Sequence, residues 1–219
     1  MSTAAILPMK SFDRAKQRLS TGLGSGHRRA LAEAMFADVL VATRRCSSID
    51  RIYVVTGDQN AARIAAGHGA TVIDDTASSH SEATRLGISL ALAEGIQRAL
   101  LIPGDCPMLD TDQLEMLLSF PVSERSALIV PDRHGEGTNA LLLTPPDALT
   151  PAFGEGSRQR HTDLATTQGA TPEVVEVPSL ALDIDTPEDL ELLRETLTAT
   201  RGGAAHTRGM LAQLERSEQ

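Results

Sequence analysis

Residues 99–107 read Ala99-Leu100-Leu101-Ile102-Pro103-Gly104-Asp105-Cys106-Pro107, an apolar run that ends in a turn and an aspartate. The apolar run predicts a buried strand. An aspartate just beyond such a strand points into the crevice where parallel-sheet proteins bind ligands. Because Pro-Gly-Asp is also common turn chemistry, Asp105 could instead cap the turn that leads to a helix after Asp110. The stretch predicts a parallel α/β sheet and makes Asp105 a candidate ligand-binding residue.

A second acidic stretch lies farther along the chain and reads Ala181-Leu182-Asp183-Ile184-Asp185-Thr186-Pro187. Its apolar residues predict another strand, on which Asp183 and Asp185 would share one face because side chains alternate along a strand. Carboxylates from two strands that meet in space can hold Mg²⁺ and leave positions open for substrate phosphates. Asp105 and Asp185 are therefore predicted metal ligands in a site for phosphoryl or nucleotidyl transfer. The alternative is that the following helix start satisfies Asp185.

Short apolar runs alternate with amphipathic segments of helical length along the chain. Strands are predicted at residues 4–7, 51–56, 71–73, 99–102, 127–130, 139–143, 174–177 and 181–184. Helices are predicted at residues 27–44, 59–68, 82–94, 111–119 and 187–197. This alternation is typical of a three-layer α/β fold with a mostly parallel sheet. Residues 1–200 are expected to form a single domain, and residues 201–219 a tail that is partly disordered or helical.

The composition argues against several classes of protein. The formal charge of −9 disfavours binding to nucleic acid, and the four Phe and one Tyr are too few for a platform on which bases stack. No apolar stretch approaches the roughly 20 residues that span a bilayer, so no membrane partner is expected. Cys46 and Cys106 lie far apart and the histidines are scattered, which predicts no zinc site and reduced thiols in the cytoplasm.

The N-terminal segment is basic although the whole chain is acidic. Residues 1–30 contain six lysine and arginine residues against one aspartate, which gives the segment a charge of +5 and leaves −14 on the remainder. Backbone amides of the loop after the first strand, together with Lys10, Lys16 and Arg18, could surround a triphosphate. The alternative is a solvated, basic helix start, and the glycines of a Walker loop are missing.

Two polar segments in the second half of the chain could bind a carboxylate or a phosphate. One precedes the strand at 139–143, and the other, residues 153–161, is expected to form a loop rich in glycine and basic residues. Hydroxyls and amides beside arginines suit such anions, although each segment alone could be only a turn. The first segment is Gly135-Glu136-Gly137-Thr138-Asn139, and the second contains Gly154 and Ser157.

Together these segments resemble the phospholactate / phosphoenolpyruvate guanylyltransferases of deazaflavin coenzyme biosynthesis, in the MobA-like nucleotidyltransferase superfamily. The resemblance spans roughly residues 4–195. The matching motifs are Pro8-Met9-Lys10 with Ala15-Lys16-Gln17-Arg18-Leu19, Gly104-Asp105-Cys106-Pro107, Gly137-Thr138-Asn139, Phe153-Gly154 with Ser157, and Asp183-Ile184-Asp185-Thr186-Pro187. The pair Ala-Lys-x-Arg-Leu and Asp-x-Asp-Thr-Pro is fairly specific, whereas Gly-Asp-x-Pro is shared with many nucleotidyltransferases. The resemblance implies a Rossmann-like, GT-A-like nucleotidyltransferase fold.

The resemblance also implies GTP as substrate and Mg²⁺ as cofactor. It places the metal on Asp105 and Asp185, and the three-carbon acid near Thr138, Gly154 and Ser157. The nucleotide is expected to contact Pro8, Lys10, Lys16, Ser81 and Gly104. The residues expected to act in catalysis are Lys10, Lys16, Arg18, Asp105 and Asp185. Where many members have Leu-Asn near the base, this chain has His80-Ser81, and Ser81 could instead cap the following helix.

The predicted enzyme transfers GMP from GTP to the phosphate of 2-phospho-L-lactate, phosphoenolpyruvate or 3-phosphoglycerate and releases pyrophosphate. These acids differ by a methyl, a methylene or a hydroxyl group, and the sequence does not choose among them. One alternative is a related transferase acting on a sugar phosphate, a polyol phosphate or a molybdopterin. Another is a non-catalytic nucleotide-binding regulator, although the presence of both acidic segments argues against it. The sequence leaves open whether the chain is a monomer or a homodimer.

Overall fold

One seven-stranded sheet forms the centre of the protein, within residues 1–12, 16–21, 23–75 and 79–217, which the computed structural model describes. Its strands are β1 (Thr3–Pro8), β2 (Arg51–Thr56), β3 (Thr71–Asp74), β4 (Arg98–Leu101), β5 (Ser126–Pro131), β6 (Thr138–Thr144) and β7 (Thr171–Val174). They lie in the order β3-β2-β1-β4-β6-β5-β7, and only β6 is antiparallel to its neighbours. The predicted mostly parallel α/β sheet is confirmed.

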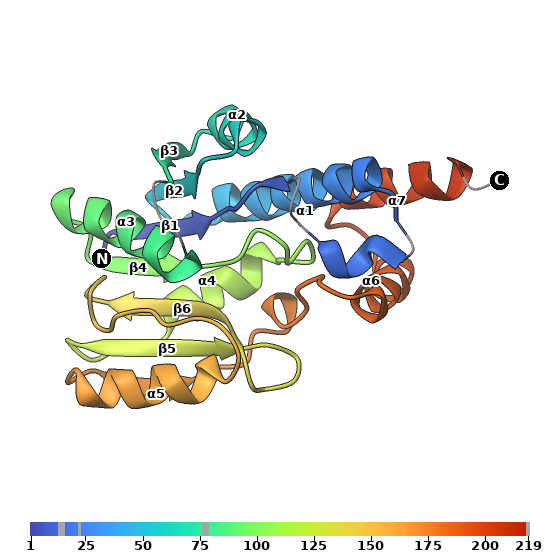
Figure 1. Ribbon diagram of the computed structural model, residues 1–219. Helices are drawn as coiled ribbons and strands as arrows, with labels where there is room; N and C mark the ends of the chain where they lie inside the picture. The colour runs from blue at the N-terminus through green and yellow to red at the C-terminus, as the bar shows by residue number, and fades with distance from the viewer. Residues whose placement is uncertain (13–15, 22, 76–78, 218–219) are drawn as a thin grey trace.

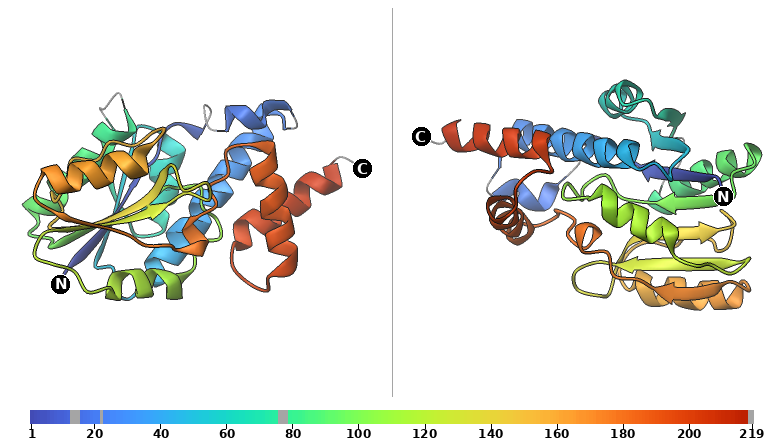
Figure 2. Two further views of the ribbon diagram at one scale, coloured as in Figure 1. Left: turned by 90° about the horizontal axis from the view of Figure 1, so that it is seen from below. Right: turned by 180° about the vertical axis from the view of Figure 1, so that it is seen from behind.

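Helices cover both faces of this sheet and complete three layers (Figure 1, Figure 2). The helices are α1 (Ser25–Arg45), α2 (Gln59–Gly67), α3 (His80–Ala93), α4 (Thr111–Ser119), α5 (Ser157–Thr167), α6 (Pro187–Ala199) and α7 (Ala205–Ser217), with short 3-10 helices η2 (Gln17–Thr21) and η3 (Pro178–Leu180). Because side chains alternate along β1, Ala5 and Leu7 belong to the apolar core with α1, α2 and α4, whereas Ala4 and Ile6 belong to the core with α3 and α5.

Helices α6 and α7 lie beyond the sheet, beside the edge at which the parallel strands end, and pack with α1 in a third apolar cluster (Figure 1). The start of α7 is fixed by a side chain of α1. The buried carboxylate of Asp38 accepts hydrogen bonds from the backbone amides of His206 at 3.0 Å and Thr207 at 2.8 Å, which satisfies two donors of the helix start. In the described residues no helix is long and apolar enough to cross a membrane.

The strand predicted at 181–184 is wrong, because this segment pairs with no strand of the described sheet. Leu182 and Ile184 are instead buried in the cluster formed with α1, α6 and α7, while Asp183 and Asp185 remain partly exposed. An irregular segment with one apolar side therefore produces the alternation that normally indicates a strand.

The strand predicted at 174–177 lies three residues too late, since β7 comprises Thr171–Val174. This strand pairs with β5 at the edge of the sheet, where a proline such as Pro172 is tolerated because part of the backbone needs no ladder partner. Val175 and Val177 follow the strand and are buried by the core on the α1 side. Their burial explains why they dominated the apolar pattern.

The loop predicted at 153–161 is also corrected, because α5 begins at Ser157. The buried side of this helix carries Ser157, His161 and Ala165, so the apolar stripe that indicates a helix is missing. Its N-terminal cap is Gly156, in the left-handed region at φ 66°, and the cap provides no side-chain hydrogen bond. Neither sequence signal of a helix start was therefore present.

Helix α3 approaches the sheet closely at Gly87, and this contact gives a prediction about stability. A Cβ added at Gly87 would lie 2.4 Å from Cγ2 of Ile6, which is fully buried in β1. We expect Gly87→Ala to lower the free energy of unfolding by about 1–3 kcal/mol, because forced overpacking outweighs the better helix propensity of alanine. Urea unfolding monitored by circular dichroism measures the change.

The matched control is Gly209→Ala, in the exposed interior of α7, where an added Cβ would meet nothing within 4 Å. This variant is expected to stabilise the protein by about 0.5–1 kcal/mol. Equal effects of the two substitutions would contradict the close packing of α3 on β1.

Candidate active site

The turn after β4 brings Asp105 to the carboxyl end of the central strands. Gly104 allows this turn to approach α1, because a Cβ at this position would lie 2.9 Å from the ring of Phe36 and 3.0 Å from Sδ of Met9. The backbone amide of Ile102 continues the pairing with β1 by donating to the carbonyl of Ile6 at 3.1 Å. The side chain of Asp105 is 26% exposed and faces the loop that follows β1.

The second acidic segment is fastened to this turn by its backbone. The amide of Ile184 donates to the carbonyl oxygen of Asp105 at 3.2 Å, and the Cys106 thiol donates to the carbonyl oxygen of Leu180 at 3.6 Å. Burial raises the pKa of the Cys106 thiol well above its ordinary value, so the thiol stays neutral. The predicted meeting of the two acidic segments is therefore present in the structure.

The carboxylate of Asp185 is not used to cap the helix that follows it. The start of α6 is a capping box, in which the Thr186 hydroxyl accepts from the amide of Asp189 at 3.2 Å and Asp189 accepts from the amide of Thr186 at 2.8 Å. Asp189 also accepts from the amide of Asp185 at 3.0 Å. The backbone of Asp185 is thereby fixed, and the alternative that the helix start occupies its carboxylate is wrong.

Lys16 joins the two predicted metal ligands. Its ammonium group donates to Oδ1 of Asp185 at 2.9 Å and to Oδ2 of Asp105, and its side chain is 6% exposed. Burial alone would lower the pKa of Lys16, but the charges and hydrogen bonds of the two aspartates outweigh burial and raise the pKa above its ordinary value. Lys16 has φ 58°, in the left-handed region that a residue with a side chain seldom adopts. One cation therefore already contacts both carboxylates.

The surroundings of these carboxylates fit a hard divalent cation. Oδ1 of Asp105 is buried and has no hydrogen-bond partner among the described residues. Burial, followed by the charge of Asp105, raises the pKa of Asp183, whose Oδ1 accepts a hydrogen bond from Asn139 at 3.2 Å. The described residues contain no complete cluster of three His, Cys, Asp or Glu ligands. Mg²⁺ needs no such cluster, because it is usually bound by one or two carboxylates and completed by substrate phosphates and water.

A cleft of about 240 Å³ is lined by most of the residues that were predicted to contact the nucleotide or the metal. Lys10 lies in it with its ammonium group 2.9 Å from a carboxylate oxygen of Asp75, and His80 also lines it. Burial lowers the pKa of His80. Arg18 is exposed on η2 and does not line this cleft. The predicted residues that do line it are Pro8, Lys10, Lys16, Gly104, Asp105 and Asp185.

Ser81 lines a neighbouring cavity of about 560 Å³, together with Gly154 and Arg160. The alternative interpretation, in which Ser81 caps the helix, is wrong because Ser79 is the N-cap of α3 and forms a capping box with Glu82. The hydroxyl of Ser81 instead accepts a hydrogen bond from the amide of Phe153 at 3.2 Å. Ser81 therefore joins the start of α3 to the loop that precedes α5.

The start of α5 is held by backbone hydrogen bonds and not by a capping side chain. Gly154 and Gly156 have φ of 115° and 66°, and the amides of Ser157 and Arg158 donate to the carbonyl oxygens of Gly154 at 3.0 Å and Glu136 at 3.1 Å. The positive end of the helix dipole still favours an anion at this end of α5. The guanidinium of Arg160 donates to the carbonyl oxygens of Ala152 at 2.9 Å and Glu155 at 2.7 Å, which stabilises the loop. Ser157, the first residue of α5, is 1% exposed.

The two predicted substrate residues at the start of β6 differ in their surroundings. Thr138 is 9% exposed, and its hydroxyl lies 2.9 Å from Nδ1 of His161. The side-chain nitrogen of Asn139 donates to the carbonyl oxygens of Leu180 at 2.7 Å and Ala181 at 3.3 Å. Asn139 therefore fastens the second acidic segment to the sheet. Its role toward a substrate stays a prediction.

The chain is similar to known proteins over nearly its whole length. The family model described as guanylyl transferase CofC like matches residues 3–215. The chain belongs to this CofC-like guanylyltransferase family. The phosphoenolpyruvate guanylyltransferase of Conexibacter woesei is 52% identical over 219 residues, which cover 99% of this chain and 98% of that protein. The 3-phospho-D-glycerate guanylyltransferase of Colwellia psychrerythraea is 37% identical over 193 residues, which cover 88% and 91%.

Solved structures of low identity share the fold of this CofC-like chain. A putative nucleotide-diphospho-sugar transferase from Desulfovibrio desulfuricans aligns with a TM-score of 0.78 at 16% identity and covers 99% of this chain and 96% of that one. A 4-diphosphocytidyl-2C-methyl-D-erythritol synthase aligns with a TM-score of 0.63 at 18% identity and covers 90% and 100%. The likeness concerns the fold and confirms the predicted nucleotidyltransferase-like architecture.

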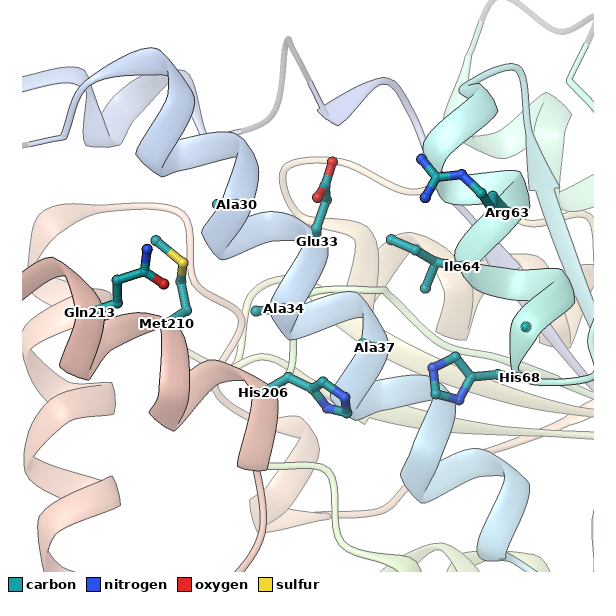
Figure 3. Close-up of a pocket in the computed structure, with 11 residues that line it drawn as sticks. Ala30, Glu33, Ala34, Ala37, Arg63, Ile64, His68, His206, Met210 and Gln213 are labelled. Atoms are coloured by element: carbon teal, nitrogen blue, oxygen red, sulfur yellow. The ribbon is translucent and has the colours of Figure 1, made fainter.

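A further cavity, of about 580 Å³, lies between α1, α2 and α7 of the CofC-like fold and shares no lining residue with the cleft at Asp105 (Figure 3). His68 and His206 face each other in it with ring centroids 6.4 Å apart. The imidazole of His206 also lies 2.9 Å from the carboxylate of Asp38, which fixes the start of α7. This cavity therefore marks the junction of the three helices.

Sequence reasoning missed several polar residues around the site of this CofC-like chain, among them His80, Asp75 and His161. His161 had the weakest sequence signal. It stands alone among charged and polar residues, and no motif marked it. Its burial could have been inferred only from the helical spacing of Ser157, His161 and Ala165, since these residues lie one turn apart along α5.

Proposed function

We propose that this protein transfers the GMP group of GTP to the phosphate of a phosphorylated three-carbon acid and releases pyrophosphate. The observation that carries the proposal is the contact of one ammonium group, on Lys16, with the carboxylates of both Asp105 and Asp185. Two remote acidic segments thus meet at a cation-binding point beside the basic N-terminal loop. The relative at 52% identity is named a phosphoenolpyruvate guanylyltransferase, which favours phosphoenolpyruvate as the acid.

In the proposed reaction a phosphate oxygen of the acid attacks the α-phosphorus of GTP. A new phosphoanhydride bond forms between the acid phosphate and GMP, and the bond from the α-phosphorus to pyrophosphate breaks. The second pKa of a phosphate monoester is about 6, so the nucleophile is already largely ionised at neutral pH. The site therefore needs no general base, and its main task is to bring several anions together and neutralise the charge on the leaving pyrophosphate.

We propose Mg²⁺ as the cofactor and Asp105 and Asp185 as its protein ligands, which agrees with the buried Oδ1 of Asp105 that has no hydrogen-bond partner in the described part of the chain. When bound, the ion would supply positive charge beside the phosphates of GTP. Lys10 and Lys16 are proposed to balance the remaining phosphate charge from within the cleft, and Arg18 to do so from exposed η2. The positive end of the α5 dipole, at the cap residue Gly156, is proposed to attract the acid.

A substrate panel tests the proposed function. Purified protein with Mg²⁺ is incubated with each of the four nucleoside triphosphates and with phosphoenolpyruvate, 3-phosphoglycerate, 2-phospholactate or a sugar phosphate. Pyrophosphate release and the product mass are then measured. We expect release with GTP and phosphoenolpyruvate, and a product whose mass is that of the acid joined to GMP. Binding of GTP without pyrophosphate release, with every acid present, would contradict the proposal and favour a nucleotide-binding regulator.

A further inference from the structure

The imidazole of His161 is buried between the loop before α5 and the start of β6. Its exposed fraction is 0%, and its Nε2 accepts a hydrogen bond from the backbone amide of Ala152 at 2.9 Å. A backbone amide can only donate, so Nε2 carries no proton. In a neutral imidazole the proton must then be on Nδ1. The hydrogen bond from Ala152 therefore selects one tautomer.

This tautomer determines the direction of the next hydrogen bond. Nδ1 of His161 lies 2.9 Å from Oγ1 of Thr138, so Nδ1–H donates and the hydroxyl oxygen accepts. The hydroxyl proton of Thr138 has to point elsewhere, and none of the described residues accepts it. Burial, followed by the positive charge of Arg160, lowers the pKa of His161 to about 4, so the neutral ring persists at working pH.

The position of this pair connects it to both parts of the proposed site. Thr138 opens β6 and retains 9% exposure, and Ala152 precedes the glycine loop at the uncapped start of α5. The ring of Phe153 lies between two histidines, with centroids 5.1 Å from His161 and 5.1 Å from His80, which lines the cleft of Asp105. His161 therefore holds both the Thr138 hydroxyl and the loop whose Phe153 ring packs against His80 of that cleft.

We propose that His161 is a positioning residue that holds the Thr138 hydroxyl as an outward hydrogen-bond donor to an anionic oxygen of the phospho-acid. The inference rests on the proposed function, which supplies the acid. A hydroxyl whose lone pair is occupied by Nδ1–H can donate to a carboxylate or phosphate oxygen without reorientation. The same hydroxyl without that donor can turn its proton away. His161 thus acts on the affinity for the acid and not on that for GTP.

Two substitutions separate the two hydrogen bonds of the ring. His161→Gln can place an amide oxygen near the Nε2 position and keep the bond from Ala152, but it offers no donor to Thr138. His161→Asn can place its amide nitrogen near the Nδ1 position and restore that donor. We expect His161→Gln to raise the KM for the acid about 10- to 100-fold with the KM for GTP unchanged, the range for one hydrogen bond to a charged group. His161→Asn should recover most of this loss.

A double-mutant cycle with Thr138→Val tests whether His161 acts through the hydroxyl. In the Thr138→Val background, His161→Gln should change the KM for the acid by less than about twofold, because the group it orients is already missing. Fully multiplicative effects, or equal increases in the KM values of GTP and the acid, would overturn the inference. Melting temperatures of all variants identify a loss that is due to unfolding.

The tautomer of His161 can also be measured in the unmodified protein. Long-range ¹H–¹⁵N spectra, assigned by the signal missing from His161→Asn or from selectively labelled protein, report the tautomer. We expect the neutral Nδ1–H form from about pH 6 to about pH 8, the range in which an ordinary histidine titrates. An Nε2–H form or a charged ring would refute the inference. If no acid supports pyrophosphate release, the proposed function is wrong. The spectra would still show whether Nδ1 of His161 donates to Thr138.

Discussion

Replacing Asp105 with asparagine is expected to lower kcat for guanylyl transfer about 10²- to 10³-fold while the protein stays folded. The substitution keeps the shape of the side chain but removes the charge that faces Lys16 and, in the proposed site, Mg²⁺. Electrostatic stabilisation of charge that develops in the transition state has this magnitude when one contributor is removed. Initial rates of pyrophosphate release at saturating GTP, phosphoenolpyruvate and Mg²⁺ measure the effect.

Asp110→Asn is the matched control for Asp105→Asn. Asp110 lies five residues later and caps α4 by accepting from the amide of Gln113 at 3.0 Å, a role that asparagine fills equally well. This control loses the same charge from the same part of the chain and should retain the turnover of the original protein. If Asp105→Asn retains near-normal turnover that depends on Mg²⁺, the proposed metal ligand is wrong.

The centre of the sheet could be predicted from the sequence because its inner strands are buried on both faces and carry largely apolar runs. Residues 99–102 and 139–143 are examples, and both lie in the central strands β4 and β6. The segment at 181–184 shows the limit of this signal. Leu182 and Ile184 are buried against helices, and an alternating pattern does not reveal whether a sheet or a helix covers the apolar side.

The start of α5 could not be recognised because its sequence lacks the usual signals. Gly156 replaces a capping Ser, Thr, Asp or Asn, and the buried face consists of Ser157, His161 and Ala165. A polar helix beside a candidate anion site thus appeared to be a loop. Departures of this kind from the usual sequence signals are expected at functional sites.

Within the candidate site, the predicted convergence of Asp105 and Asp185 is present although the strand expected before Asp185 is not, because the amide of Ile184 donates to the carbonyl oxygen of Asp105 at 3.2 Å. The position of Lys16 could not be predicted in this detail, since it depends on a left-handed backbone conformation at a residue that is not glycine. The sequence places Lys16 beside the phosphates of the nucleotide but not between the two aspartates. That its ammonium group contacts both carboxylates is a result of the tertiary structure.

The position of Lys16 leads to the second prediction with a large effect. We expect Lys16→Met to lower kcat/KM about 10²- to 10³-fold, because the proposed transition state loses a buried positive charge beside the phosphates. The same substitution removes the ammonium group that now contacts both aspartates, and with it the competitor for a divalent cation at that point. Mg²⁺ alone should therefore raise the melting temperature of Lys16→Met more than that of the original protein.

Lys10→Met is the control for Lys16→Met. It also removes a positive charge from the cleft, but it leaves the Lys16 ammonium group between the two aspartates. Lys10 lies in the same cleft, but it pairs with Asp75 and its side chain is 44% exposed. This variant should weaken the binding of GTP and leave the effect of Mg²⁺ on the melting temperature unchanged. Melting curves with and without Mg²⁺, recorded without nucleotide, compare the three proteins. An equal Mg²⁺ shift in Lys16→Met and the original protein would mean that the cation does not bind where the ammonium group of Lys16 lies, and that Asp105 and Asp185 are joined by the lysine alone.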